Sequence, residues 1–334
     1  MRSRFPLVLG IFTLFIFSWA MVPTFAEGRS AQLVHKKAGK KKIHNKKAEK
    51  KKIRPVSRGV DAKAGYCVNL NGNQTLWARN PDQQLPIASL TKLVTALVAL
   101  ENMPVGQKLT VPDHIKKIPK SVVGLKAGDN VSVGDLLHGL LIGSGNDCAE
   151  TLACGFPGGS QAFVHAMNKK VRGLGTKRTI FYTASGLDKK GTNGKEAKDS
   201  LDVDSNLSTA REIASIARVA FANPTIREIS LKRGYVLSSS LEKSGYAVRT
   251  TNKLLRDNLP LIGGKTGYTS KAGHCLATEF TPGQNVLLIV VLGSPDHFRD
   301  TRLVYRKALK EASRIKIPPA QRIRDPNQVA SNQK

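Results

Sequence analysis

Hydrophobic residues change their spacing twice along this chain, and that change restricts the folds available to it. Two strand-like runs flank Asn71 and Gly72, a dipeptide typical of β-hairpin turns. Helical spacing then dominates from about residue 86 to residue 222, and strand-like runs return from Tyr235 onward. A helix beginning near His297 follows the last strand. This order predicts an α+β domain, in which both chain ends build one antiparallel sheet around an inserted helical region.

The first helix of that region contains a lysine among apolar residues. In "PIASLTKLVTALVALEN", residues 86–102, aliphatic side chains recur at helical spacing, which predicts a mostly buried helix. Ser89 and Lys92 stand three residues apart and therefore share one helix face. Burial lowers the proton affinity of a lysine, so Lys92 is a candidate base for a nucleophilic Ser89. The structural alternative is that Ser89 caps the helix and Lys92 extends to solvent.

The Ser-x-x-Lys pattern is weak by itself, because it occurs at two other places in this lysine-rich chain. One copy starts at Ser240 in a polar turn between strand-like runs, and the other starts at Ser313 in a basic terminal helix. Only the Ser89 copy combines helical spacing with apolar surroundings. We therefore expect Ser89 to be the functional copy.

Two further triplets strengthen that expectation. Ser144, Gly145 and Asn146 lie in a glycine-bracketed turn between two predicted helices, where side chains are presented rather than buried. The triplet Lys265-Thr266-Gly267 lies in or near a strand whose glycines let another backbone come close. Ser-x-x-Lys, Ser-x-Asn and Lys-Thr-Gly in this order form the motif set of penicillin-binding proteins and class A β-lactamases.

On these motifs the sequence resembles the low-molecular-mass penicillin-binding proteins, the serine D-alanyl-D-alanine peptidases of the S11 type. Other segments resemble that family's landmarks: "PIASLTKL", "FPGGSQAFVHAMN", "ASGLD", "NLSTARE", "TTNKLL" and "GGKTGYTSKAGHC". The resemblance covers about Gly59 to Ile317, which predicts a catalytic domain over residues 59–317. It implies the transpeptidase-like fold that penicillin-binding proteins share with β-lactamases. Within the family, the chain is most similar to the D-alanyl-D-alanine endopeptidase branch.

The resemblance implies a role for each motif residue. Ser89 would attack the D-Ala-D-Ala carbonyl to form an acyl-enzyme, and a neutral Lys92 would take its proton. Ser144 would relay a proton to the leaving amine, and Asn146 would position Lys92 or a substrate amide.

The third motif would bind the substrate. Lys265 would supply positive charge for the substrate carboxylate, assisted by Thr266 and with Gly267 beside it in the strand. The oxyanion hole of the family maps to the backbone N–H groups of Ser89 and Tyr268. No metal and no organic cofactor is implied, and the partners are peptidoglycan peptides as substrates and β-lactams as covalent inhibitors.

Two other functions fit parts of the pattern. A class A β-lactamase has a deacylating glutamate in a Glu-x-x-Leu-Asn motif, which this sequence lacks. A catalytically silent wall-binding protein could keep the fold, but all three motifs are intact here. We therefore expect a long-lived β-lactam acyl-enzyme.

The first 58 residues differ in composition from the rest. Residues 1–26 contain two arginines, then an apolar run, then small residues, which predicts a secretory signal that is cleaved after Ala26. The alternative is an uncleaved membrane anchor. Residues 27–58 are rich in lysine and almost free of acids, which predicts a disordered arm that carries much of the net charge of +29. In an exported protein of the periplasm or cell envelope, such an arm meets anionic wall polymers or a membrane surface rather than nucleic acid. It could equally be an inert spacer.

The four cysteines suggest neither disulfides nor a metal. Cys67 and Cys275 lie in strand-like runs, whereas Cys148 and Cys154 lie six residues apart on one predicted helix, too far along its axis to bond. No metal-ligand spacing is visible. We expect small buried thiols.

Residues 318–334 bear on the type of D-Ala peptidase. They form a short polar tail with no apolar face for a bilayer, whereas many carboxypeptidases of the family end in a β-rich domain and an amphipathic helix. An enzyme that is not held at a membrane reaches cross-links within the wall. The tail therefore favours endopeptidase activity.

Overall fold

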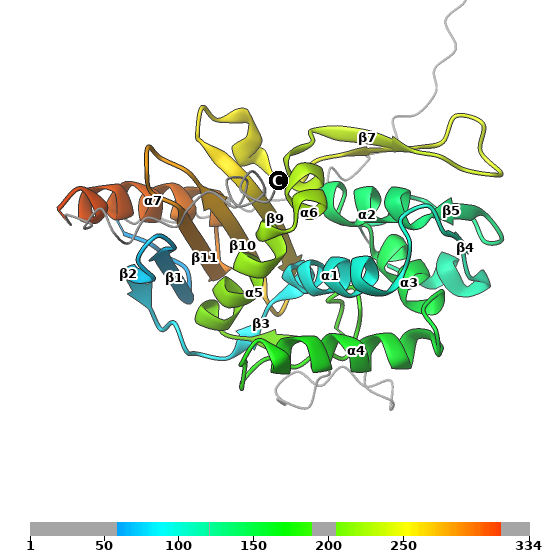
Figure 1. Ribbon diagram of the computed structural model, residues 1–334, viewed down its shortest axis with the longest axis horizontal. Helices are drawn as coiled ribbons and strands as arrows, with labels where there is room; N and C mark the ends of the chain where they lie inside the picture. Colours follow the sequence, from blue (N-terminus) through cyan, green and yellow to red (C-terminus); the bar gives the residue numbers. More distant parts are fainter. Residues whose placement is uncertain (1–58, 120, 189–204, 315–334) are drawn as a thin grey trace, which may run out of the picture. The chain divides into compact units, whose positions relative to one another are not determined.

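The central sheet has five antiparallel strands and draws them from both ends of the sequence (Figure 1). The computed structural model describes residues 59–119, 121–188 and 205–314, all of which belong to one unit over residues 55–334. The strand order is β2-β1-β11-β10-β9. The strands are β1 (Ala64–Asn69), β2 (Gln74–Arg79), β9 (Leu261–Thr269), β10 (Gly273–Phe280) and β11 (Leu287–Ser294). The predicted α+β class and the sheet built from both ends are confirmed.

Helices cover both faces of the sheet. Side chains of alternate strand residues point to opposite faces, and both sets are apolar and buried. Cys67, Ile289 and Val291 pack with α7 (His297–Arg314) in one apolar cluster. Their neighbours, such as Tyr66 and Val290, pack into a larger cluster with the inserted helices. The sheet is therefore the middle of three layers, as Figure 1 shows for α7 and α5.

The inserted region is mainly helical. Its helices are α1 (Lys92–Asn102), α2 (Val133–Ile142), α3 (Asn146–Cys154), α4 (Gly159–Gly173), α5 (Ala210–Ala222) and α6 (Pro224–Leu231). Helix α1 is buried on every side from Lys92 to Ala99, which places it at the centre of the larger cluster. Helix α6 was not predicted; Pro224 stands at its N-terminus and the Asn223 side chain caps it.

Short elements connect these helices and the sheet. Three single 3₁₀ turns are η1 (Ala88–Thr91), η2 (Asp113–Lys117) and η3 (Lys253–Arg256). Two-stranded pairs join β3 (Leu85–Pro86) to β6 (Leu207–Ser208), β4 (Lys108–Thr110) to β5 (Asn130–Ser132), and β7 (Gly234–Leu237) to β8 (Tyr246–Arg249). The β7–β8 hairpin was predicted from its two strand-like runs.

The first hairpin turn differs from expectation, and the start of α5 is capped from one side only. The first hairpin turn has four residues between its strands, and the left-handed residue is Asn73 (φ 50°) rather than Gly72. At the start of α5, Thr209 accepts a hydrogen bond from the Glu212 N–H, but the Glu212 carboxylate accepts from Lys177 and Arg178 instead of returning to Thr209. The capping box is thus only half formed.

The predicted signal (residues 1–26), basic arm (residues 27–58) and polar tail (residues 318–334) lie outside the described residues, as do residues 315–317 of the predicted catalytic domain. Within the described ranges, no helix has the length and apolar character needed to span a membrane. All four cysteines are free, and Cys154 alone among them is partly exposed.

Candidate active site

Ser89 and Lys92 meet where η1 passes into α1. Ser89 lies in the 3₁₀ turn, Lys92 is the first residue of the α-helix, and their Oγ and Nζ atoms are 2.8 Å apart. Ala88 before them has a left-handed backbone (φ 48°), a strained conformation for a residue with a Cβ. Ser89 caps neither helix, and Lys92 is fully buried, so the structural alternative for this pair is wrong.

Lys92 Nζ has two further partners inside the protein. It lies 2.8 Å from Asn146 Oδ1 and 2.7 Å from the carbonyl oxygen of Ser185. The Asn146 Nδ2 group donates to the carbonyl oxygen of Pro119, which fixes the amide with its oxygen toward Lys92. The amine is therefore held by three groups, and the Ser89 hydroxyl is the one among them that can also donate a hydrogen bond.

The second serine–lysine pair is assembled by the fold. Ser144 lies between α2 and α3 in a left-handed conformation (φ 59°), and Lys265 lies in β9. Lys265 Nζ is 2.8 Å from Ser144 Oγ and 2.8 Å from the carbonyl oxygen of Thr266. The structure thus brings the second and third motifs together over a separation of 121 residues.

Both lysines hold their protons weakly. Burial, and then the charge of Lys265, set the pKa of Lys92 well below its ordinary value. Burial lowers the pKa of Lys265 to about 7. A site with two desolvated amines can keep one neutral and one charged near neutral pH, which suits proton transfer.

Gly267 lets β9 approach the backbone of Ser89. A Cβ atom on Gly267 would lie 3.0 Å from the Ser89 nitrogen and 3.1 Å from the carbonyl oxygen of Ile87. The Tyr268 side chain is 60% exposed and lies against the His274 ring, with 4.5 Å between ring centroids. The backbone of β9, rather than the side chain of residue 268, therefore borders the serine.

Thr266 is buried, and its hydroxyl lies 2.6 Å from that of Thr251. Thr251 belongs to the segment "TTNKLL", which follows the β8 strand. All eight predicted site residues thus lie on η1, α1, β9 or the α2–α3 junction.

The sequence did not indicate a role for residues 182–186, which include the Ser185 carbonyl that contacts Lys92. Asn206 accepts from the Tyr182 and Thr183 N–H groups and donates to Thr91 Oγ1, which ties this segment to η1. Gly186 is left-handed (φ 81°), and a Cβ there would lie 2.1 Å from the carbonyl oxygen of Ala88. The segment "ASGLD" was noted as a landmark, but a backbone carbonyl such as that of Ser185 leaves no signal in a sequence.

Asp147 is another site residue that sequence reasoning missed. Its buried carboxylate accepts from the backbone N–H groups of residues 123, 124 and 125. The neighbouring Asn146 N–H donates to the carbonyl oxygen of Ser121. Asp147 therefore fixes the loop that passes beside the Ser144 turn.

The serines of the other two Ser-x-x-Lys copies are hydrogen-bonded to other groups. The Ser240 hydroxyl donates to Asp129 Oδ1 at 2.7 Å, and the Ser313 hydroxyl donates to the carbonyl oxygen of Lys310 on the surface of α7. Lys316 lies outside the described residues. Ser89 is thus the copy whose hydroxyl contacts its lysine.

Comparison with known proteins agrees with this arrangement. The model of the D-alanyl-D-alanine carboxypeptidase family Peptidase_S11 matches residues 47–296. The chain is 32% identical to a D-alanyl-D-alanine endopeptidase of Pseudomonas aeruginosa, over 80% of this chain and 83% of that protein. It is 33% identical to a D-alanyl-D-alanine endopeptidase of Escherichia coli, over 70% and 72% of the two chains.

Solved structures of D-alanyl-D-alanine carboxypeptidases and DD-transpeptidases have a similar fold. A D-alanyl-D-alanine carboxypeptidase from Mycobacterium tuberculosis superposes with a TM-score of 0.67 at 27% identity, over 81% of this chain and 96% of that one. A serine-to-alanine mutant of the Streptomyces K15 DD-transpeptidase has a TM-score of 0.67 at 26% identity, over 76% and 100%. The expected transpeptidase-like fold is confirmed, and the chain belongs to the S11 family of serine D-alanyl-D-alanine peptidases.

Proposed function

We propose that this protein hydrolyses D-Ala amide bonds of peptidoglycan peptides through an acyl-enzyme on Ser89, and that it prefers cross-linked peptides. Family membership and the names of its relatives support D-alanyl-D-alanine peptidase activity. The observation that carries the mechanism is the 2.8 Å contact between Ser89 Oγ and a fully buried Lys92 Nζ.

The three partners of Lys92 support its role as a general base. A neutral amine has two N–H groups and one lone pair. The oxygens of Asn146 and Ser185 can only accept, so they take the two N–H groups. The lone pair is left for the Ser89 hydroxyl, which then donates to Lys92 and is ready to lose its proton.

In the acylation step, Ser89 Oγ forms a bond to the carbonyl carbon while its proton moves to Lys92. The carbon–nitrogen bond then breaks, and the leaving amine receives a proton from the Ser144 hydroxyl. Ser144 recovers a proton from Lys265, which lies 2.8 Å away. Water then attacks the acyl carbon and the bond to Ser89 Oγ breaks, which releases the shortened peptide; Ser89 regains its proton from Lys92, and the proton that water loses returns through Ser144 to Lys265.

The third motif binds the substrate. A charged Lys265 attracts the carboxylate beyond the scissile bond, and the Thr266 hydroxyl contributes a hydrogen bond. The N–H groups of Ser89 and Tyr268 stabilise the oxyanion, a role that the close approach of β9 to the Ser89 nitrogen at Gly267 supports.

Neither rival function is favoured. The sequence has no Glu-x-x-Leu-Asn motif for rapid β-lactam hydrolysis, so β-lactams act as covalent inhibitors. A silent wall-binding protein has no need for two buried lysines in contact with serines, an arrangement that is expensive to maintain.

The preference for cross-links rests on the two relatives named D-alanyl-D-alanine endopeptidase. The test incubates the purified enzyme with cross-linked dimer muropeptides and with a monomer pentapeptide, and follows both by chromatography and mass spectrometry. Faster cleavage of the dimer supports the preference. Rapid D-Ala release with intact dimers would overturn it while leaving the Ser89 mechanism in place.

We also propose that the chain is exported to the cell envelope and that the basic arm, residues 27–58, holds it to anionic wall polymers or a membrane surface. Such an attraction weakens as salt rises. Deleting the arm should reduce sedimentation with isolated walls at low salt and leave hydrolysis of a small soluble peptide unchanged. Equal sedimentation with and without the arm would identify it as a spacer.

A further inference from the structure

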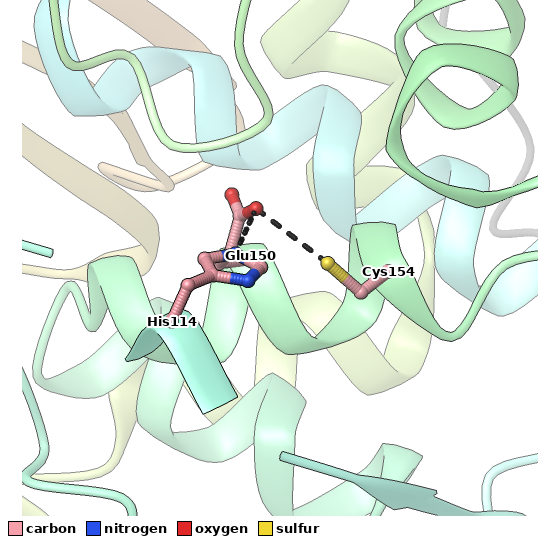
Figure 2. A group of neighbouring side chains, drawn as sticks. All are labelled: His114, Glu150 and Cys154. Carbon is pink, nitrogen blue, oxygen red and sulfur yellow. Dashed lines mark hydrogen bonds and ion pairs between the residues drawn. The ribbon is translucent and has the colours of Figure 1, made fainter. Parts of the chain in front are cut away.

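Three side chains that play no part in the D-Ala peptidase mechanism meet on the surface of the helical region: His114, Glu150 and Cys154. His114 comes from η2, whereas Glu150 and Cys154 lie one and two turns beyond Asn146 on α3. Residues four apart share a helix face, so Glu150 and Cys154 point the same way. Figure 2 shows His114 and Cys154 on either side of the Glu150 carboxylate.

Two distances in this group resemble those between the ligands of one metal ion. His114 Nε2 lies 3.0 Å from Glu150 Oε1, Cys154 Sγ lies 3.5 Å from the same oxygen, and the three ligand atoms lie within 4.8 Å of one another. In a tetrahedral zinc site with bonds of about 2.0 Å to nitrogen and oxygen and about 2.3 Å to sulfur, neighbouring ligands are about 3.3 Å (N to O) and about 3.5 Å (S to O) apart. The nitrogen-to-oxygen and sulfur-to-oxygen distances in the group are close to these values.

We propose that His114, Glu150 and Cys154 form a binding site for a zinc ion, with water in the fourth position. The nitrogen, oxygen and sulfur donor set is one that zinc accepts, whereas calcium and magnesium prefer oxygen ligands. The His114 side chain is 48% exposed and that of Glu150 is 27% exposed, so an ion reaches the group from solvent.

Binding exchanges hydrogen bonds for metal bonds. Burial raises the pKa of the Cys154 thiol, so without the ion the thiol keeps its proton and donates to Glu150. Zinc forms a bond to the thiolate as the S–H bond breaks, and the proton passes to solvent. Ser160 Oγ lies 3.3 Å from the sulfur and remains as an outer hydrogen-bond partner.

The ion would join η2 to α3, the helix that carries Asn146 and Asp147 at its other end. The N–H groups of residues 123–125, which follow η2, donate to the Asp147 carboxylate at the start of α3. A zinc ion between η2 and the far end of α3 would add a second link between α3 and the stretch of chain that starts at η2. Zinc should raise the melting temperature of the protein and leave the geometry of Ser89 unchanged.

The test uses cobalt as a spectroscopic substitute for zinc, with the complete chain. His35 and His44 of the basic arm offer other nitrogen ligands, so metal stoichiometry alone does not identify this site. A cobalt–thiolate charge-transfer band reports the sulfur ligand. We expect one such band per chain, displaced by zinc but not by calcium, together with the rise in melting temperature.

Three variants locate the site. Cys154→Ser should abolish the band, and His114→Gln should weaken zinc binding at least about tenfold. The matched control His165→Ala changes another exposed histidine, on α4, and should behave as the wild-type chain. Labelling of Ser89 with penicillin verifies that each variant is folded. A band that persists in Cys154→Ser, or zinc binding that is equal in wild type and His114→Gln, would overturn the proposal.

Discussion

The candidate active site contains two serine–lysine pairs with the same 2.8 Å separation and different origins. Ser89 and Lys92 are three residues apart and meet within one turn, whereas Ser144 and Lys265 meet only because β9 lies beside the α2–α3 junction. Lys92 has two acceptors that leave its lone pair to Ser89, and Lys265 lies between a hydroxyl and a carbonyl oxygen. The local pair is suited to accept a proton, and the assembled pair is suited to deliver one.

The largest effect is expected from removing the hydroxyl of the local pair. Ser89→Ala should abolish covalent labelling by fluorescent penicillin while leaving the circular dichroism spectrum unchanged, because no other group can form the acyl bond. The matched control is Ser313→Ala, which alters an exposed serine of the same Ser-x-x-Lys pattern. Peptide mapping that finds the label on Ser240 or Ser313 would contradict the assignment.

Replacing the base while keeping positive charge should be nearly as severe. A guanidinium does not lose its proton in a protein, so Lys92→Arg should slow acylation by about 10² to 10⁴-fold. The exposed Lys243→Arg is the control and should acylate normally. Acylation of Lys92→Arg at a rate near that of wild type would show that the local pair does not supply the base.

Displacing β9 from the local pair should have a smaller effect. In Gly267→Ala the new methyl group would press on the Ser89 nitrogen and the Ile87 carbonyl oxygen, so we expect acylation to slow by about 10 to 100-fold. Gly173→Ala, where a Cβ meets no atom within 4 Å, is the control. Stopped-flow measurement of the acylation rate compares Gly267→Ala with Gly173→Ala. Equal rates would mean that strand position is not critical.

The smallest effect is expected in the pH dependence of the acylation rate, to which the two lysines contribute in opposite directions. Acylation needs a neutral Lys92 and a charged Lys265, and both pKa values are lowered. The rate should rise with pH as Lys92 loses its proton, and fall as Lys265 loses its own near pH 7. Lys265→Arg keeps its charge but cannot give a proton to Ser144, so its acylation rate should be lower throughout and should lack the alkaline decline. A rate that still climbs above pH 7 in wild type would argue that Lys265 need not be charged.

The comparison also shows what could be predicted from the sequence. The local pair was predictable because i, i+3 spacing and apolar neighbours are both visible in the chain. The α-helix itself starts at Lys92 rather than before Ser89. Ala88 has a left-handed backbone, which could not be predicted because that conformation usually occurs at glycine. The contact of Ser144 with Lys265 required the sheet order, which the motifs implied only by resemblance.

Other features had no usable signal. Helix α6 was not predicted because a proline such as Pro224 commonly follows the end of a helix, although proline also favours the first position of a helix. The Ser185 carbonyl acts through the backbone, which every residue possesses. His114 and Glu150 are 36 residues apart and lie outside any metal-ligand spacing, so only the packing of η2 on α3 brings them together.

The pairing of β1 with β11 has a consequence for how the enzyme comes into being. The first described strand finds its partner more than 200 residues later, and β9 contributes Lys265 only shortly before that. Such a chain has high contact order, so it folds slowly and cannot complete its sheet as it emerges from the ribosome. Ser89 is made early, but its neighbours from β9 arrive after about three quarters of the sequence has been synthesised. A nascent or truncated chain is therefore inert, and hydrolytic activity begins only once the whole domain has closed.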